Sequence, residues 1–407
     1  MKNTRGRCEL PSEESRGWTV VTGGPPVTSA GLSVTTAGLS VTIEGFSVTI
    51  EGLSVSPAGL SVGVMGSGVT ASVVETLVKS SAALPPGAGV SELNDPPPVG
   101  LGEKLSYHEA IERASSSLYR FPLLPVRGIP LMNHIANSWD TIWAFRPDPS
   151  DILIATYPKA GTTWTQEIVD LLLHNGDADA CKRAPTPARS PFLEIVSPPP
   201  IPSGIDLMKN MDPPRIIKTH LPFQLVPPAF WENKCKTIYV ARNAKDNMVS
   251  YYHFDCMNKT QPEPGPWEGY ISKFMRGELA WGSWYDHVKG YWKEREKRNI
   301  LYLFYEDMKE NPRREVERIM KYLDLSLSDE VISRIVELTS FEIMKENPMA
   351  NYSCIPTHVF DNSVSPFMRK GQVGDWRNHF TPEQSKMFAE DYDKKMKEVN
   401  IPFRTLI

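Results

Sequence analysis

The sequence predicts an α/β fold: a single P-loop-like domain with a central, mostly parallel β-sheet flanked by helices, preceded by a disordered N-terminal segment. Short apolar runs alternate with helical patterns in the C-terminal part of the chain, as in successive βαβ units. The loop "TYPKAGTTW" follows the first of these runs, and a loop between a strand and a helix can bind an anion. The composition changes sharply near residue 118. We therefore expect a low-complexity extension over residues 1–117 and one domain over residues 118–407.

The overall composition argues against several classes of protein. The net charge of −4 disfavours a nucleic-acid-binding protein, which would normally be basic. The five cysteines are an odd number without a C-x-x-C pair, which indicates neither a disulfide framework nor a zinc site. The sequence contains no 18-residue apolar run and no signal-peptide core. We expect a cytoplasmic protein with no nucleic-acid partner and no membrane partner.

The extension contains a seven-residue repeat between Ala30 and Val64, with units such as "AGLSVTI" and "EGFSVTI". Each unit holds a glycine and β-branched residues, which argues against a coiled coil. Short β-like pairing remains open, but large apolar groups are too few to offset the entropy of ordering, so we expect disorder. A proline-rich linker follows over Pro85–Gly102, and Glu103–Arg120 fits a short amphipathic helix.

Four apolar runs in the C-terminal part predict strands of a buried parallel sheet. They are Asp151–Tyr157, Arg215–His220, Cys235–Arg242 and Asn299–Met308. Helical patterns fill the gaps between them. Ligands of open α/β sheets bind beyond the carboxyl ends of the strands. The residues just after each run are therefore the candidates for a functional site.

In the first loop Lys159 precedes Gly161, whereas the Walker pattern places its lysine after the second glycine. Backbone N–H groups at a helix N-terminus bind anions, and Lys159, Thr162 and Thr163 add a charge and two hydroxyls. Taken alone, the loop fits equally well with a tight turn that carries a surface lysine.

The other strand ends add a base and further cations. Lys218 and His220 point the same way if the second run is extended. A histidine can take a proton from a nucleophile while a lysine stabilises developing negative charge. Arg242 and Ser250 follow the third run, and Arg369–Gly371 form a basic, turn-rich loop near the C-terminus. Two separated anion sites and one base indicate a ligand that is charged at both ends.

The motifs "TYPKAGTTW", "KTHLP", "YVARNAKD", "FYEDM" and "FMRKGQVGDW", in this order and spacing, resemble those of the cytosolic sulfotransferases. The similarity is greatest to the phenol and aryl members (family 1) and extends from about Gly128 to Ile407. It is specific because several independent motifs agree. The resemblance implies an enzyme that transfers a sulfuryl group from 3′-phosphoadenosine 5′-phosphosulfate (PAPS) to a hydroxyl or amine of a small acceptor, without a metal ion.

The resemblance also implies roles for individual residues. The catalytic residues would be His220 as general base, Lys159, Lys218 and Ser250. The residues expected to bind PAPS are Lys159, Ala160, Gly161, Thr162, Thr163, Trp164, Arg242, Ser250, Tyr305, Thr339, Phe341, Phe367, Met368, Arg369, Lys370 and Gly371. Within this set, Trp164 and Phe341 would stack on the adenine.

The acceptor implied by the resemblance is a phenol or another small, mostly apolar hydroxylated compound. The expected acceptor-binding residues are Ile135, Phe192, Ile195, Lys218, His220, Phe254 and Val359. For each apolar member, ordinary core packing is an equally good interpretation. Ile195 and Val359 are branched where several phenol-specific relatives have phenylalanine, so a somewhat different acceptor shape is expected.

A homodimer is the partner that the resemblance implies, through a C-terminal motif similar to K-x-x-x-T-V-x-x-x-E. The aligned stretch here is "RNHFTPEQSK". Arg377 replaces the lysine of the motif with another basic residue, and Thr381 matches its threonine. Pro382 removes a backbone donor and Lys386 reverses the charge of the last position. We therefore expect this route to a dimer to be weakened.

Two other functions remain open from the residues. A P-loop nucleotide kinase shares the strand–loop–helix logic, but it would need a lysine after the glycine and an aspartate that holds magnesium. A non-catalytic binding protein would bind its partner through the N-terminal repeats. The residues expected to be essential for transfer are all present, which favours the sulfotransferase.

Overall fold

The computed structural model describes residues 107–114, 117–197 and 200–407, together with five short strands between residues 19 and 62. The chain divides into two compact units, Met1–Gly100 and Leu101–Ile407. None of the helices in the described part of the chain has both the length and the apolar character of a membrane span.

The first unit contains two small antiparallel sheets. Strands β1 (Thr19–Val21), β2 (Leu39–Ile43) and β3 (Phe46–Ile50) form one, and β4 (Leu53–Ser56) pairs with β5 (Gly59–Val62) to form the other. Neighbouring repeats pair with each other here, which is the β-like pairing that the sequence left open. Apart from these strands, residues 1–106, including the linker Pro85–Gly102, lie outside the described residues.

The second unit is built on a four-stranded parallel sheet in the order β11-β10-β8-β9. Its strands are β8 (Ile152–Thr156), β9 (Ile216–Thr219), β10 (Lys236–Ala241) and β11 (Ile300–Phe304). Since all four run in parallel, their carboxyl ends meet at one edge. The predicted α/β class with a parallel sheet is confirmed.

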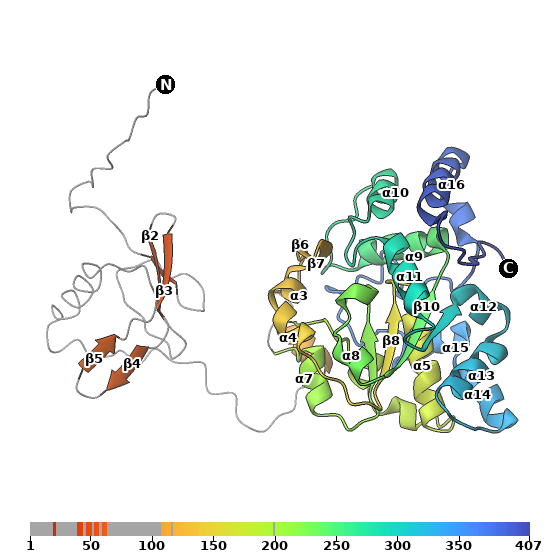
Figure 1. The fold of residues 1–407 in the computed structure, drawn as a ribbon, viewed down its shortest axis with the longest axis horizontal. Helices are drawn as coiled ribbons and strands as arrows, with labels where there is room; N and C mark the ends of the chain where they lie inside the picture. Colours follow the sequence, from red (N-terminus) through yellow and green to blue (C-terminus); the bar gives the residue numbers. More distant parts are fainter. Residues whose placement is uncertain are drawn as a thin grey trace. The chain divides into compact units, whose positions relative to one another are not determined.

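Helices cover both faces of this sheet, as Figure 1 shows for β8 and β10. Alternation along β8 fills two cores, because Ile152 and Ile154 pack on the side of α5 while Leu153 and Ala155 pack on the side of α9 and α11. The helices that follow β8 are α5 (Thr162–Leu173), α6 (Thr186–Arg189), α7 (Gly204–Lys209), α8 (Ala229–Glu232), α9 (Ala244–Met257), α10 (Trp267–Arg276), α11 (Trp284–Glu294), α12 (Tyr305–Glu310), α13 (Pro312–Tyr322), α14 (Asp329–Leu338), α15 (Phe341–Glu346) and α16 (Pro382–Met396).

The segment before β8 adds a helix, a hairpin and two short helices. These are α2 (Tyr107–Ala114), the antiparallel pair β6 (Leu123–Val126) and β7 (Ile129–Met132), α3 (Asn133–Asn137) and α4 (Trp139–Trp143). Helix α2 lies within the predicted helical segment Glu103–Arg120. It also lies N-terminal to the boundary expected at residue 118, although it belongs to the second compact unit. That boundary stays a prediction.

One predicted strand is too long. The run Asn299–Met308 leaves the sheet after Phe304, and Tyr305–Glu310 forms α12 instead. Glu306 and Asp307 lie in the first turn of α12, where negative charge complements the partial positive charge of a helix N-terminus. The Glu306 carboxylate also accepts a hydrogen bond from the Asn243 backbone N–H at 2.8 Å.

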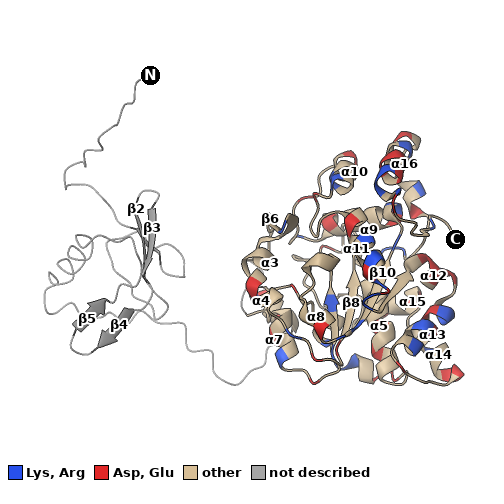
Figure 2. Ribbon diagram, in the orientation of Figure 1, with Lys and Arg blue, Asp and Glu red and all other residues tan. Residues whose placement is uncertain are grey.

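The outer helices carry charges of both signs. Lys and Arg are interspersed with Asp and Glu along α13, α14 and α16 (Figure 2). Such neighbours form ion pairs along a helix, for example Arg313 with Glu317 at 2.9 Å. The concentration of cations described next is therefore a local property of the domain.

Candidate active site

A cavity of about 310 Å³ lies where the loops after the strands meet. It brings together residues from the first loop, the ends of β9 and β10, helix α9 and the basic C-terminal loop. The predicted site residues that line it are Lys159, Gly161, Thr162, Thr163, Trp164, Phe192, Ile195, Lys218, His220, Arg242, Ser250, Phe254, Tyr305, Thr339, Phe341, Val359, Phe367, Met368, Arg369, Lys370 and Gly371. Ala160 and Ile135 are not among the lining residues.

The loop between β8 and α5 has the geometry of an anion cradle. Lys159 and Gly161 both have left-handed backbones, with φ of 67° and 110°. A side chain at Gly161 would bring its Cβ to 2.9 Å from Tyr305 Cδ2, so the close approach of α12 requires glycine. The first N–H groups of a helix have no partner inside the helix, and Thr162, Thr163 and Trp164 of the first turn of α5 line the cavity. A non-glycine residue held with a positive φ, as Lys159 is, is a form of strain that is concentrated at functional sites.

Four cations converge on this cradle. The pKa of Lys159 is lowered to about 7, first by burial and then by the charges of Lys218, Arg242 and Arg369. Burial also lowers the pKa of Lys218 to about 8, against the opposing charge of Glu194. Mutual repulsion of buried cations is unfavourable unless an anion joins them. The cluster therefore fits a ligand with more than one negative group.

His220 is held in the state that a general base needs. Its Nδ1 lies 2.8 Å from the Thr156 carbonyl oxygen, which can only accept, so Nδ1 carries the proton and Nε2 keeps its lone pair. The ring stands edge-on to Phe192 and Trp281, with centroids 4.9 and 5.3 Å away. Burial, and next the charge of Lys218, hold the pKa of His220 well below its usual value. The imidazole is consequently neutral at neutral pH.

Sequence reasoning missed the residue that fixes the backbone at His220. The carboxylate of Glu194 accepts hydrogen bonds from the His220 backbone N–H at 2.7 Å, from Thr219 Oγ1 at 2.8 Å and from Trp281 Nε1 at 3.0 Å. Burial raises the pKa of Glu194 to about 7. The one sequence signal for it is a single acidic residue inside the apolar stretch "PFLEIV".

At the other end of the cavity, Arg242 and the basic loop present further donors. Arg242 reaches the Lys159 and Gln372 carbonyl oxygens, at 3.2 and 3.0 Å. Arg369 and Lys370 both pair with Asp375 at 2.6 Å, which the sequence did not predict. Among the described residues, Nε of Arg242 and Nε of Arg369 are buried without a hydrogen-bond partner. Such unpaired donors fit a bound anion.

Aromatic side chains lie next to these donors. Trp164 stands edge-on to Tyr305 at 5.6 Å, and the guanidinium of Arg242 lies 4.3 Å from the Tyr305 ring centroid. Gly371 has a φ of 61°, and a Cβ there would lie 2.3 Å from Phe341 Cδ2. The glycine therefore lets the basic loop pack directly on the Phe341 ring. Flat faces beside cations suit a planar base that carries phosphate groups.

The acceptor side is apolar, with one predicted residue out of place. Ile135 is fully buried in the core, so the structure does not support a pocket role for it. Met132 and His134 of the same segment line the cavity instead. The His134 Nδ1 is buried with no hydrogen-bond partner in the described part of the chain, and burial lowers the pKa of His134 to about 4.

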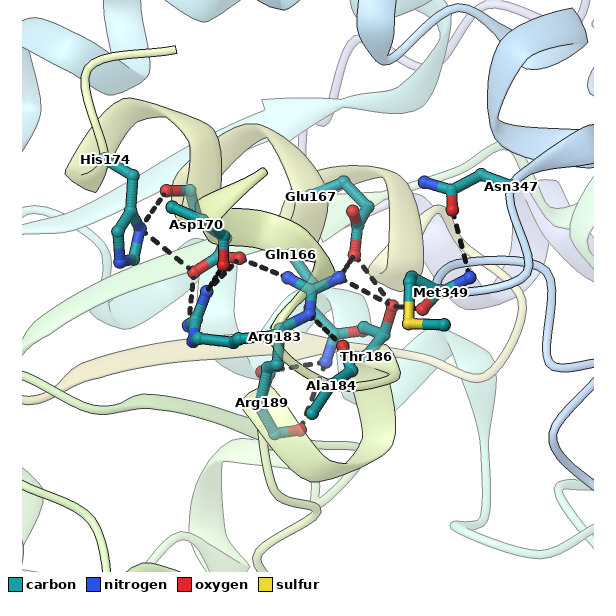
Figure 3. Close-up of polar contacts among 12 residues, drawn as sticks. Gln166, Glu167, Asp170, His174, Arg183, Ala184, Thr186, Arg189, Asn347 and Met349 are labelled. Atoms are coloured by element: carbon teal, nitrogen blue, oxygen red, sulfur yellow. Dashed lines mark hydrogen bonds and ion pairs between the residues drawn. The ribbon is translucent and has the colours of Figure 1, made fainter. Parts of the chain in front are cut away.

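A buried ion-pair network joins α5 to the end of α6 (Figure 3). Arg189, at the end of α6, pairs with Glu167 at 2.5 Å and with Asp170, both on α5. Arg183 adds a second contact to Asp170 at 2.7 Å. Three residues after Arg189, Phe192 forms a parallel bridge with Lys218. The network thus connects the helix after the cradle to the segment that faces Lys218 and His220.

The chain is similar to known sulfotransferases. The sulfotransferase domain model matches residues 149–400. Sulfotransferase 1 family member D1 of Mus musculus is 52% identical over 290 residues, which cover 71% of this chain and 98% of the relative. Sulfotransferase 1B1 of Canis lupus familiaris is 52% identical over 282 residues, which cover 69% and 95%. Retinol dehydratase, solved with androsterone and the inactive cofactor PAP, matches with a TM-score of 0.65 at 25% identity, over 72% of this chain and 94% of its own.

The chain belongs to the sulfotransferase family. It is an enzyme of the transferase class, and the relatives above are named as members of sulfotransferase family 1. The resemblance inferred from the motifs is confirmed.

Proposed function

We propose that the protein transfers a sulfuryl group from PAPS to the hydroxyl or amine of a small, mostly apolar aromatic acceptor such as a phenol, with His220 as general base. The observation that supports this most directly is the environment of His220. Its Nδ1 is committed to the Thr156 carbonyl oxygen, which leaves an unprotonated Nε2 on a ring that lines the cavity. Cations surround it, and they stabilise negative charge that develops on the reacting oxygens.

PAPS is the sulfuryl donor, and the residues present fit it. The retinol dehydratase structure contains the inactive cofactor PAP. In this chain the cradle after β8 would hold the 5′-phosphosulfate, and Arg242, Ser250 and the loop Arg369–Gly371 would hold the 3′-phosphate. The buried, unpaired Nε atoms of Arg242 and Arg369 support that assignment. Trp164, Tyr305, Thr339 and Phe341 would surround the adenine.

The reaction needs one bond to form and one to break at sulfur. The donor supplies an activated sulfuryl group, and the acceptor oxygen forms the new O–S bond as the bridging O–S bond breaks. His220 Nε2 takes the acceptor's proton. Lys159 and Lys218 stabilise charge on the bridging and equatorial oxygens, as cations do in phosphoryl transfer. Phe192 and Trp281 pack edge-on against the imidazole and hold its orientation.

The acceptor side supports a compact hydroxylated compound. Phe192, Ile195, Phe254 and Val359 present apolar surface to the cavity. A small pocket of this kind holds a ligand by apolar contact and orients it with few polar groups. The retinol dehydratase neighbour was solved in complex with androsterone, so a protein of similar fold binds a small molecule beside PAP.

The test is product formation with purified full-length chain. Incubation with PAPS and 4-nitrophenol is expected to give the sulfated phenol in the presence of EDTA. Transfer that instead requires ATP and Mg²⁺ would favour the nucleotide kinase. Absence of sulfated product across phenols, catechols, iodothyronines and steroids, with PAP still bound, would favour a non-catalytic binding protein.

A homodimer and a cytoplasmic location stay predictions. Pro382 occupies the first turn of α16, after Thr381, whose side chain caps the helix through the Gln384 N–H at 3.2 Å. A proline is well tolerated there because that N–H has no partner inside the helix. Pro382 therefore does not disturb α16 itself, while Pro382 and the charge of Lys386 both depart from the dimer motif. Sedimentation at micromolar concentration would distinguish monomer from dimer.

A further inference from the structure

Helix α2 packs directly against the acceptor side of the cavity. Its buried side chains, Ala110, Ile111 and Ala114, form a helical stripe, and Leu118, which follows the helix, is also buried. These residues form one apolar cluster with Ile201, Tyr352, Ile355 and Val359 from segments far apart in the sequence. The helix lies N-terminal to the part of the chain that the family model matches.

Three residues of this region reach the cavity itself. Tyr107, Ile111 and Leu118 line it alongside Val359, one of the predicted acceptor residues. Tyr107 also packs within the cluster that contains Tyr352, whose ring centroid lies 5.9 Å from Lys218 Nζ. The wall formed by α2 is therefore adjacent to the catalytic lysine.

Polar contacts hold α2 in this position from its exposed side. His108 Nδ1 lies 2.9 Å from the Cys354 carbonyl oxygen. Glu112 lies 3.9 Å from His358, on the segment that carries Val359. Just after the helix, the Arg120 guanidinium donates to the carbonyl oxygens of Asn258 and Gln261, at 3.0 and 2.8 Å. The first two contacts join α2 to the segment that carries Cys354 and Val359, and Arg120 joins the residues after α2 to the segment Asn258–Gln261.

We propose that α2 is a wall of the acceptor cavity, and that Tyr107 and Ile111 determine which acceptors the enzyme prefers. This inference rests on the proposed sulfuryl transfer and identifies the acceptor class more narrowly. A helix that packs onto Ile355 and Val359 takes up space that a large acceptor would need. The preferred acceptors are then compact one- or two-ring phenols, and fused four-ring alcohols are disfavoured.

The test compares two acceptors, 4-nitrophenol and a hydroxysteroid, by kcat/KM in full-length variants. Ile111→Ala is expected to raise the steroid-to-phenol ratio about tenfold, because removing branched carbons enlarges the pocket and weakens contact with the small ring. Ile111→Trp is expected to lower the ratio by a similar factor. The matched control is Arg113→Ala, on the exposed side of the same helix, which should leave the ratio unchanged.

A second variant tests the packing of the helix without altering a lining residue. Ala110 is buried in the cluster but is not part of the cavity wall, so Ala110→Asp should displace α2 and shift the ratio in the same direction as Ile111→Ala. The affinity for PAP reports the integrity of the donor side and should remain unchanged in Ile111→Ala.

The outcomes separate the two proposals. A wild-type ratio that persists in Ile111→Ala and Ile111→Trp, with transfer intact, overturns the role of α2 alone. Wild-type chain that binds PAP but sulfates none of the phenols, catechols, iodothyronines and steroids overturns the proposed function and, with it, this inference. An equal change of the ratio in Arg113→Ala would also overturn it, because the effect would then not come from the cavity wall.

Discussion

The two sides of the cavity are built in different ways. The donor side consists of strand ends, backbone N–H groups and cations, and its geometry is fixed by glycines that admit no side chain, such as Gly161 and Gly371. The proposed acceptor side consists of apolar side chains from α2, from the segment near Ile201 and from the segment near Val359. Strict geometry on one side and adaptable packing on the other would allow one reaction to serve different acceptors. His220 lies where the two sides meet.

The largest effect is expected for His220→Ala. Loss of the base should lower kcat by about 10³-fold, within the usual range for removal of general acid–base catalysis. Binding of PAP should change little, because His220 belongs to the junction and not to the anion cradle. Rapid-quench measurement of sulfated phenol and calorimetry with PAP would check both. Turnover near that of the wild type would contradict the assignment of the base.

Lys159→Met should weaken PAPS binding but raise the melting temperature of the ligand-free protein. Removal of the cradle's cation is expected to weaken PAPS binding about 100-fold, typical of a lost charge-assisted contact to a phosphate group. The pKa of Lys159, about 7 when folded, lies below the value near 10.4 of an unfolded lysine, so the unfolded chain binds more protons between these values. The charged lysine therefore costs stability near pH 7, and the ligand-free variant should melt several degrees higher.

Lys245→Met is the matched control for that variant. Lys245 is a partly buried lysine whose Nζ lies 2.6 Å from Ser385 Oγ, and it does not line the cavity. The Lys245→Met substitution should leave the affinity for PAPS unchanged. A melting temperature of Lys159→Met below that of the wild type would show that the cation cluster is not a source of instability.

Gly371→Ala should raise the KM for PAPS about tenfold. The new methyl group would meet the Phe341 ring, so the basic loop and the ring must move apart. Gly374→Ala is the control, because Gly374 also has a positive φ of 90° but a Cβ there would meet Leu406 at 3.1 Å, outside the cavity. Both substitutions strain the backbone, by about 1 kcal/mol. A donor KM raised equally by both would mean that backbone strain, and not the contact with Phe341, causes the effect.

Much of the donor side could be predicted from the sequence because its residues follow buried strands. Once β8, β9 and β10 were recognised as parallel, Lys159, Lys218 and Arg242 had to lie at one edge. The residues of the acceptor side were predicted less accurately from the sequence. Ile135 was expected in the pocket but lies in the core, since the hairpin and α3 turn Met132 and His134 toward the cavity instead.

Other features depended on contacts between distant segments. The pairing of Asp375 with Arg369 and Lys370 arises where the basic loop folds back on itself. The packing of α2 on Ile355 and Val359 joins residues more than 200 positions apart, and a helical pattern indicates which face is apolar but not what covers it. The end of β11 was placed too late because Tyr305 and Met308 continue the apolar run although they belong to α12.

The smallest predicted effect is the pH dependence of donor binding. The pKa of Lys159 is about 7 and that of Lys218 about 8 in the ligand-free protein, so both lose charge as the pH rises through this window. An anionic donor binds the protonated forms, and PAP affinity should fall about three- to tenfold between pH 7 and pH 8.5. Calorimetry in buffers of different ionisation enthalpy should detect proton uptake on binding. In Lys159→Met the decrease should shift toward pH 8, where Lys218 alone titrates. Affinity that is constant across this range in the wild type would place the two lysines outside the donor cradle.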